Sequence, residues 1–256
     1  MPYTISHTAA VLPFSRWLRP RRLLSAAVIG SMIPDLGYLL PYHLPRADTH
    51  ALHALFAFCL PAGLACYWLF QLLIKPAALE ALPDGAYAHA LSVAASARIG
   101  ALRDWLRASV GVLAGAITHL SWDAFTHEGA RGVRMFPALN DNLADVGGHR
   151  LLIYKILEQG SSVIGLLVVL WIAWRALTVP APEPRPVRRL ATPEREAWCA
   201  AYPACALLAV AVALGVAGMG HGVYGLIGAT AIAVMRGLAF AAVAVSLVLR
   251  VRLRRP

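Results

Sequence analysis

Long apolar runs alternate with short basic segments along this chain. Runs that are long enough for a helix to cross roughly 30 Å of hydrocarbon occupy residues 51–74, 105–125, 151–174, 199–219 and 223–249. Predominantly apolar runs of this length indicate membrane-spanning helices and exclude a soluble domain. The pattern therefore predicts an all-α fold, a polytopic transmembrane helix bundle.

Two shorter apolar stretches, 5–15 and 23–40, precede these runs. A turn rich in arginine separates them, and Pro13 and Pro20 interrupt any continuous helix because proline has no N–H to donate. We expect the pair to form an N-terminal helical hairpin that packs against the other helices. The basic turn, residues 16–22, is expected to face the cytoplasm.

The connections between the runs suggest how the chain is divided. Residues 76–104 form a partly amphipathic connection, and residues 128–150 form a polar, glycine-containing loop. The Pro/Arg-rich segment 179–195 has the composition of a linker. It predicts a motif-bearing membrane core at 1–178 and a C-terminal transmembrane helix pair at 196–256.

Composition supports a membrane location. Hydrophobic residues make up 59% of the chain and charged residues 14%, whereas soluble domains are about half apolar and about a quarter charged. The net charge of +10 comes largely from basic residues beside the apolar runs, as the positive-inside rule requires of cytoplasmic loops. No aromatic pattern for base stacking accompanies them, so we expect no nucleic-acid partner. A cell membrane is the expected location, with membrane lipid as the immediate partner.

The same distribution of Lys and Arg predicts an orientation. The linker 179–195 and the C-terminus fall inside and the loop 128–150 outside, with Arg131, Arg134 and Arg150 as exceptions. Arg236, within the last run, is expected to pair with an acid or to face a wet seam. Gly111 and Gly115 have GxxxG spacing, which favours close helix packing within the bundle over a dedicated dimer face.

Polar side chains within the apolar runs form a pattern that indicates chemistry. His119, Asp123 and His127 are spaced i, i+4 and i+8, which places them on one helical stripe about 80° wide. The outer two lie about 12 Å apart along the axis, so the three cannot all bind one ion. Asp123 can share an ion with either histidine, or it can bridge two ions that each hold one histidine.

Further ligand-type residues lie at helix ends that the predicted orientation brings to the same membrane face. Together they predict a divalent metal site made of His7, Asp35, His50, His119, Asp123 and His127. Imidazole and carboxylate ligands favour zinc and also suit manganese or iron. Asp35 and Asp123 are the candidate catalytic residues, as metal bridges or bases.

The remaining histidines and loop acids are expected to be structural or solvated. His53 could replace His50, and loop acids could add a ligand, an acid or a base. The residues in this set are His43, His53, His89, His149, His221, Glu128, Asp141 and Asp145. The four cysteines form no CxxC pair and indicate neither a disulfide framework nor a zinc knuckle.

Three functions remain open at this stage. A metal-dependent hydrolase would act on a lipid or lipid-linked ester or phosphoester near the membrane face. A transporter or non-catalytic metal-binding membrane protein would use the same residues as an ion pathway or store, and a scaffold would use them only to hold helices together. Residues 109–118 are nearly apolar, which argues against a continuous transport path. No GxSxG, Walker or Rossmann motif is present.

Five segments together resemble a known bacterial family: PYTISHTAAVLPF, SAAVIGSMIPD, THALHALFAFCLP, GAITHLSWDAFTH and YKILEQGSSVIG. They resemble the multi-span membrane proteins of domain-of-unknown-function family 4184 over about residues 1–178. The resemblance implies the bacterial inner (cytoplasmic) membrane as the location. More distantly, the pattern is similar to LexA-binding, inner-membrane-associated metal-dependent hydrolases. The resemblance implies that the six candidate ligands are shared polar positions. Relatives carry a histidine near the start of the helix expected at 151–174, where this chain has Glu158, Gln159 and Gly160, so Glu158 could serve in its place.

Overall fold

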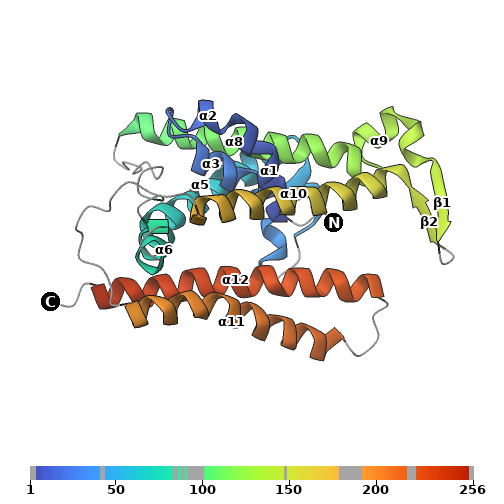
Figure 1. The fold of residues 1–256 in the computed structure, drawn as a ribbon. Helices are drawn as coiled ribbons and strands as arrows, with labels where there is room; N and C mark the ends of the chain where they lie inside the picture. Colours follow the sequence, from blue (N-terminus) through green and yellow to red (C-terminus); the bar gives the residue numbers. More distant parts are fainter. Residues whose placement is uncertain are drawn as a thin grey trace. The chain divides into compact units, whose positions relative to one another are not determined.

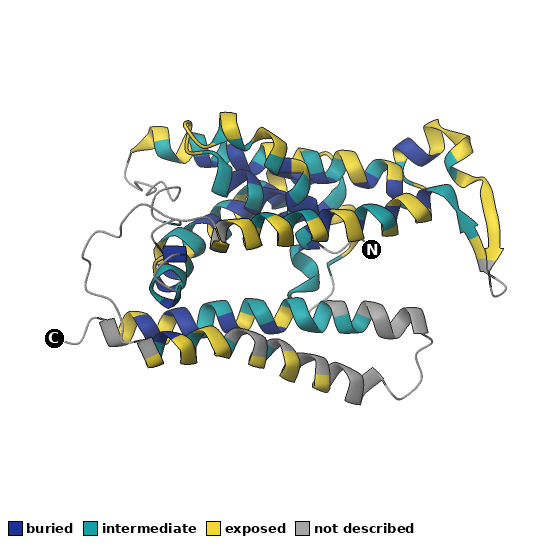
Figure 2. Cartoon of the chain, viewed as in Figure 1, coloured by how far each residue is buried: buried dark blue, intermediate teal, exposed yellow. Residues whose placement is uncertain are grey.

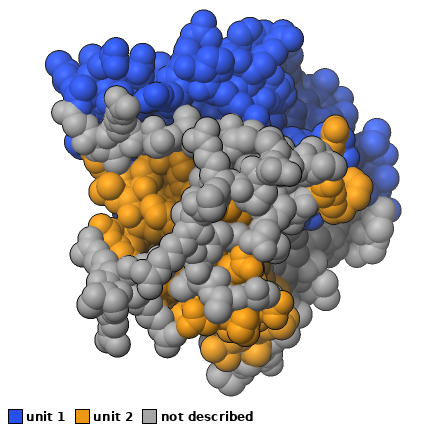
Figure 3. Space-filling view, turned by 60° about the vertical axis from the view of Figure 1, so that its left-hand side comes forward, with its two compact units in different colours: residues 1–37, 42–67, 98–172 blue, residues 38–41, 68–97, 173–256 orange. Residues whose placement is uncertain are grey.

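The structure, a computed structural model, describes residues 4–40, 44–82, 86–87, 90, 101–146, 149–178, 192–217 and 223–253. It is mostly helical, which confirms the predicted fold class. The chain divides into two compact units, residues 1–37, 42–67 and 98–172 in unit 1 and residues 38–41, 68–97 and 173–256 in unit 2 (Figure 3). Residues 179–191 of the predicted linker lie outside the described residues, so the division at the linker stays a prediction.

The N-terminal hairpin of unit 1 is built from short helical pieces (Figure 1). Its first limb contains η1 (Thr4–His7), α1 (Thr8–Val11), η2 (Leu12–Phe14) and α2 (Ser15–Leu18), and its second contains α3 (Leu24–Gly30) and η3 (Ile33–Tyr38). Pro13 lies in the 3₁₀ turn η2, where its missing N–H interrupts the α-helical ladder. Arg22, with φ of 59°, closes the basic turn. The predicted hairpin is confirmed.

The core of unit 1 lies where α3 crosses the long helix α8 (Leu102–Thr126), and Figure 2 shows buried residues concentrated there. The two backbones approach so closely that a Cβ added at Gly115 would lie 2.0 Å from the Ala27 oxygen. A Cβ at Gly30 would lie 2.1 Å from the Val112 oxygen. The GxxxG pair of α8 therefore serves packing within the chain, as predicted.

The predicted loop 128–150 holds more regular structure than its sequence suggested. It contains α9 (Arg131–Met135), η6 (Pro137–Asn140) and an antiparallel pair of strands, β1 (Asn142–Val146) and β2 (His149–Leu152). Val146 pairs with His149 in the register. The signal for this hairpin is Gly147-Gly148, a dipeptide typical of two-residue hairpin turns. After β2 the chain enters α10 (Ile153–Thr178).

A succession of helical segments follows the N-terminal hairpin. It contains α4 (Arg46–His50), the π-helix η4 (Leu55–Cys59), α5 (Leu60–Leu69), the π-helix η5 (Phe70–Ile74) and α6 (Lys75–Ala81). Each π-helix lies just before a proline, Pro61 or Pro76. The wider π turns accommodate residues that cannot supply the next N–H of an α-helix.

In unit 2, α11 (Thr192–Ala217) and α12 (Val223–Leu253) lie side by side in opposite directions (Figure 1). Ala77 of α6 joins Val245 and Leu249 of α12 in a buried apolar cluster. Arg250 Nη1 donates to the Leu72 main-chain oxygen at 3.1 Å. In an α-helix this oxygen would accept from the N–H of residue 76, but residue 76 is proline and has no N–H.

Arg236 of α12 pairs with main-chain oxygens rather than with an acid. Its Nε donates to the Tyr38 oxygen and its Nη2 to the Leu40 oxygen, each at 2.8 Å. Main-chain carbonyls at and just after the end of η3 therefore take the place of an acidic partner, and Arg236 is exposed, as the alternative of a wet seam required. A guanidinium can bond to several acceptors at once because it carries five N–H donors.

Within the described residues, three helices are long and apolar enough to cross a membrane: Leu55–Ala81, Ile153–Arg175 and Ile232–Val251. α8 covers the predicted run 105–125, but polar side chains such as His119 and Asp123 lower its apolar content. α11 covers the run 199–219 as far as Ala217. Large apolar side chains exposed on α10 include Val163, Ile164, Leu167, Leu170, Trp171 and Trp174. These features fit a multi-pass membrane protein, and its location in the inner membrane stays a prediction.

Candidate metal centre

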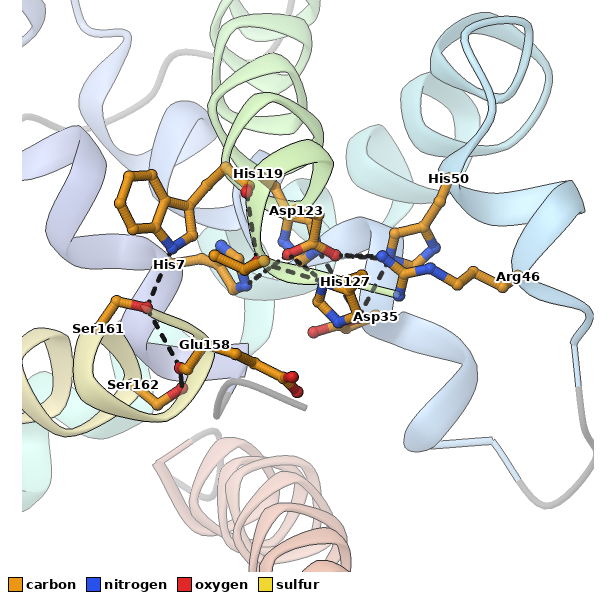
Figure 4. A network of polar contacts seen from close by, with 12 residues as sticks. His7, Asp35, Arg46, His50, His119, Asp123, His127, Glu158, Ser161 and Ser162 are labelled. Carbon is orange, nitrogen blue, oxygen red and sulfur yellow. Dashed lines mark hydrogen bonds and ion pairs between the residues drawn. The ribbon is translucent and has the colours of Figure 1, made fainter. Parts of the chain in front are cut away.

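All six predicted ligand residues lie in unit 1, and their side chains converge (Figure 4). They come from η1, η3, α4, α8 and the residue that directly follows α8: His7, Asp35, His50, His119, Asp123 and His127. Four of them are buried, with 1% to 5% of their surface exposed, while His50 and His127 are partly exposed. The helix-end residues therefore meet the stripe on α8, as the sequence predicted.

Asp123 lies at the middle of the cluster. Its Oδ1 atom is 3.6 Å from His7 Nε2 and 3.6 Å from His127 Nδ1. Its Oδ2 atom is 3.5 Å from His50 Nε2 and 3.4 Å from His119 Nε2. One carboxylate thus faces four imidazoles, two on each oxygen, which is the arrangement that a bridging ligand would need.

Asp35 approaches the same imidazoles from the hairpin. Its Oδ1 atom is 3.4 Å from His50 Nε2 and 3.7 Å from His119 Nε2. Thr4 donates a hydrogen bond of 2.9 Å to the other oxygen, Oδ2. This bond fixes the carboxylate so that Oδ1 points toward the imidazoles.

These spacings fit ligands around a shared ion. Tetrahedral zinc bonds of about 2.0–2.1 Å place neighbouring ligand atoms about 3.3–3.4 Å apart, and a direct N–H···O bond would be nearer about 2.9 Å. The candidate ligands form two sets, and within each set the ligand atoms all lie within 4.8 Å of one another. One set is His7, His119 and Asp123, and the other is Asp35, His50 and His119. His119 belongs to both sets.

Several of these atoms are buried without a hydrogen-bond partner among the described residues: His7 Nε2, His50 Nε2, His119 Nε2 and Asp123 Oδ1. A buried polar atom without a partner is costly, and native structures contain few of them. Here they face one another across a small space. A divalent cation would give all of them a partner, so the residues present fit a metal ion.

The other ring nitrogens hold two of the imidazoles in orientation. His119 Nδ1 lies 2.8 Å from the Ser31 main-chain oxygen, and His50 Nδ1 lies 2.7 Å from Thr49 Oγ1. Because a carbonyl oxygen only accepts, His119 Nδ1 carries a hydrogen, and Nε2 is the ring nitrogen that faces the carboxylates. Such bonds are the usual support of metal-binding histidines.

The charge state of the outer histidines also suits metal binding. Burial, followed by the neighbouring His119 imidazole, lowers the pKa of His7 to about 4. Burial likewise lowers the pKa of His50. Both effects disfavour the imidazolium, so the two rings are neutral at pH 7, the form that binds metals.

Arg46 is a member of the cluster that sequence reasoning missed. Its Nη2 atom donates to Asp123 Oδ2 at 2.5 Å. Its side chain is 41% exposed, whereas that of Asp123 is 5% exposed. The signal in the sequence is its position four residues before His50, which places the two on one face of α4.

The other candidates belong to neither set of clustered ligand atoms among the described residues. Glu158 is fully buried and accepts a bond of 2.8 Å from Lys155 Nζ, and it belongs to neither set of clustered ligand atoms in the described part of the chain. His53 is exposed, as are the acids Glu128, Asp141 and Asp145. His43, His89 and His221, and the side chain of His149, lie outside the described residues.

Hydrogen bonds attach α10 to the elements that carry the cluster. Trp122 Nε1 of α8 donates to Ser161 Oγ at 3.0 Å. Ser6 Oγ, next to His7, donates to the Ser162 oxygen at 2.7 Å. The start of α10 therefore supports both η1 and α8 without contributing a member of either ligand set.

The fold and this cluster define a class: helical proteins with candidate membrane spans and buried His/Asp groups that could hold a metal ion. Within that class, the chain belongs to the family Domain of unknown function 4184 (DUF4184), whose profile matches residues 1–247. The match extends well past the predicted limit at about 178. No curated protein and no solved structure matches the chain, and the similarity to LexA-binding hydrolases stays a prediction.

Proposed function

We propose that this chain is a membrane-embedded, metal-dependent hydrolase that acts on an ester or phosphoester in a lipid or lipid-linked molecule. The observation that carries the proposal is the set of buried, unpartnered ring nitrogens on His7, His50 and His119 around two carboxylates. Zinc is the preferred ion because imidazole and carboxylate ligands suit it, and manganese or iron would also fit.

The bound metal would lower the pKa of a water molecule and polarise the ester. The chain would supply the rest of the chemistry. In hydrolysis the water oxygen bonds to the ester carbon or phosphorus, the bond to the leaving oxygen breaks, and a water proton ends on that oxygen. Asp35 Oδ1, in a carboxylate that Thr4 orients through Oδ2, would accept and return that proton, and Asp123 would hold two imidazole pairs together.

The rival function is transport or non-catalytic metal binding. Transport would need polar groups to continue along α8 away from the cluster. The buried residues of α8 that precede His119 are Ala108, Gly111, Val112, Gly115 and Ala116, all apolar. This side of α8 offers no polar path, which favours a closed site over a pathway.

Metal analysis and hydrolysis assays test the proposal together. The protein is purified in detergent without chelators, loaded with zinc or manganese, and assayed with fluorogenic carboxylic esters and phosphoesters. Bound metal with turnover that a chelator abolishes is the expected result. Absence of bound metal after loading would reject the proposal, and bound metal without turnover of either ester class would favour the non-catalytic binder.

A further inference from the structure

We infer that Arg46 binds the phosphoryl group of the substrate, so that this centre acts on phosphoesters rather than neutral carboxylic esters. The inference rests on the proposed function and narrows its substrate class. Arg46 is the first residue of α4, and His50, one helical turn later, faces the same carboxylate. Its guanidinium reaches Asp123 while 41% of its side chain stays exposed. It therefore links the exposed side of the cluster to its buried middle (Figure 4).

The ion pair of Arg46 uses an atom that a metal would also need. Asp123 Oδ2 accepts from Arg46 Nη2 at 2.5 Å and lies 3.5 Å from His50 Nε2 and 3.4 Å from His119 Nε2. A cation held by those nitrogens would take the same oxygen as a ligand. Two positive groups would then compete for one carboxylate oxygen, and the pairing of Arg46 with Asp123 would weaken.

A loosened guanidinium would stay beside the metal with donors to offer. Of its five N–H donors, one bond is made among the described residues, to Asp123. With neutral imidazoles, the two carboxylates of Asp35 and Asp123 cancel the charge of a divalent ion. The positive charge of Arg46 is then left for a substrate anion.

A phosphoryl group fits these requirements better than a carboxylic ester. It carries negative charge, and its several oxygens can contact a metal and a guanidinium at the same time. The planar fork of arginine matches phosphate oxygens in a bidentate geometry. A neutral ester carbonyl has one oxygen to polarise and no charge for Arg46 to balance.

Binding of inorganic phosphate to the zinc-loaded protein tests the inference without relying on turnover. We expect Arg46→Gln to weaken phosphate binding roughly 10- to 100-fold, the loss typical of a hydrogen bond to a charged group, and Arg46→Lys to lie between. Arg134→Gln on α9 is the matched control, because Arg134 is exposed and outside the cluster, and it should bind phosphate like the wild type. Zinc content, measured in parallel, should be unchanged or higher in Arg46→Gln, because the guanidinium that competes with zinc for Asp123 Oδ2 has been removed.

Competition experiments separate two sources of the phosphoryl group. Phosphatidic acid in mixed micelles presents a lipid headgroup, and glycerol 3-phosphate presents the same group in water. Displacement of phosphate by either one, lost in Arg46→Gln, supports the inference and names the source. Displacement by neither overturns it.

The outcomes distinguish this inference from the function on which it rests. If zinc-loaded Arg46→Gln binds phosphate as tightly as the wild type, Arg46 is only a counter-ion of Asp123, and the hydrolase proposal stands without it. If the wild-type protein binds no metal, both proposals fail.

Discussion

The Nδ1 atom of His119 lies 2.8 Å from the main-chain oxygen of Ser31, a contact between α8 and the end of α3. It fixes which ring nitrogen of His119 faces the two carboxylates. The contact exists because α3 and α8 meet at glycines, where the backbones can approach closely. The chemistry of the cluster therefore depends on the packing of two helices.

Gly115→Ala should disturb the cluster through this packing. The added Cβ would lie 2.0 Å from the Ala27 oxygen and 2.6 Å from the Ser31 nitrogen, so α3 must move. We expect a loss of roughly 1–3 kcal/mol in stability, as overpacking costs, together with reduced metal content. Thermal unfolding in detergent and metal analysis measure the two effects. Gly160→Ala is the control, since its Cβ would meet nothing within 4 Å, and equal losses in both variants would contradict this account.

Asp123→Ala should abolish metal retention. Asp123 lies within 3.6 Å of four imidazole nitrogens, so its removal affects every pair in the cluster. Substituting a residue that only supports a metal ligand typically lowers metal affinity about 10- to 100-fold. Because Asp123 is itself a proposed ligand, its removal should lower metal affinity further. Asp141→Ala, at an exposed position, should retain the metal. Retention by Asp123→Ala would show that the metal lies elsewhere.

The metal-free protein should lose stability as the pH falls from about 6.5 toward about 4. The pKa of His7 is about 4 in the folded protein and 6.5 in an exposed histidine, so the unfolded chain takes up the proton first. This linkage favours unfolding by an amount on the order of 3 kcal/mol at the acid end. His7→Gln should flatten the decline in thermal unfolding temperature over this pH range. An unchanged slope would mean that His7 does not control it.

The chain should remain with membranes after alkaline and high-salt washing. Its helices at Leu55–Ala81, Ile153–Arg175 and Ile232–Val251 are long and apolar enough to span a bilayer. Fractionation followed by immunoblotting gives the answer. Recovery in the soluble fraction without detergent would end the membrane-spanning interpretation.

The Lys/Arg distribution predicts that position 191 faces the cytoplasm and position 138 the opposite side. Single cysteines, Ala191→Cys and Ala138→Cys in a cysteine-free background, should differ in labelling by an impermeant reagent on intact cells. Only Ala138→Cys should react. Labelling of Ala191→Cys would reverse the orientation.

The stripe on α8 could be predicted because it depends on local geometry alone. His119, Asp123 and His127 share a face in any α-helix with that spacing. The arrival of His7, Asp35 and His50 followed from helix ends that a hairpin and the orientation rule bring together. These inferences used only periodicity and charge.

Other features depend on tertiary neighbours that no local pattern reveals. Arg46 resembles any basic residue beside an apolar run until its distance to Asp123 is known. Arg236 was expected to pair with an acid or to face a wet seam, and it bonds to main-chain oxygens because the end of η3 lies nearby. The β1–β2 hairpin had a local signal in Gly147-Gly148, which the polar composition of the loop concealed.

The bond from Arg250 to the Leu72 oxygen, 178 positions earlier in the chain, links the substitutions that two distant positions can accept. Proline at 76 takes an N–H away from that oxygen, and arginine at 250 returns a donor to it. Replacing Arg250 by leucine would be harmful beside Pro76 and tolerable beside alanine. Substitutions at 76 and 250 are therefore expected to be epistatic, so that neither position varies independently of the other.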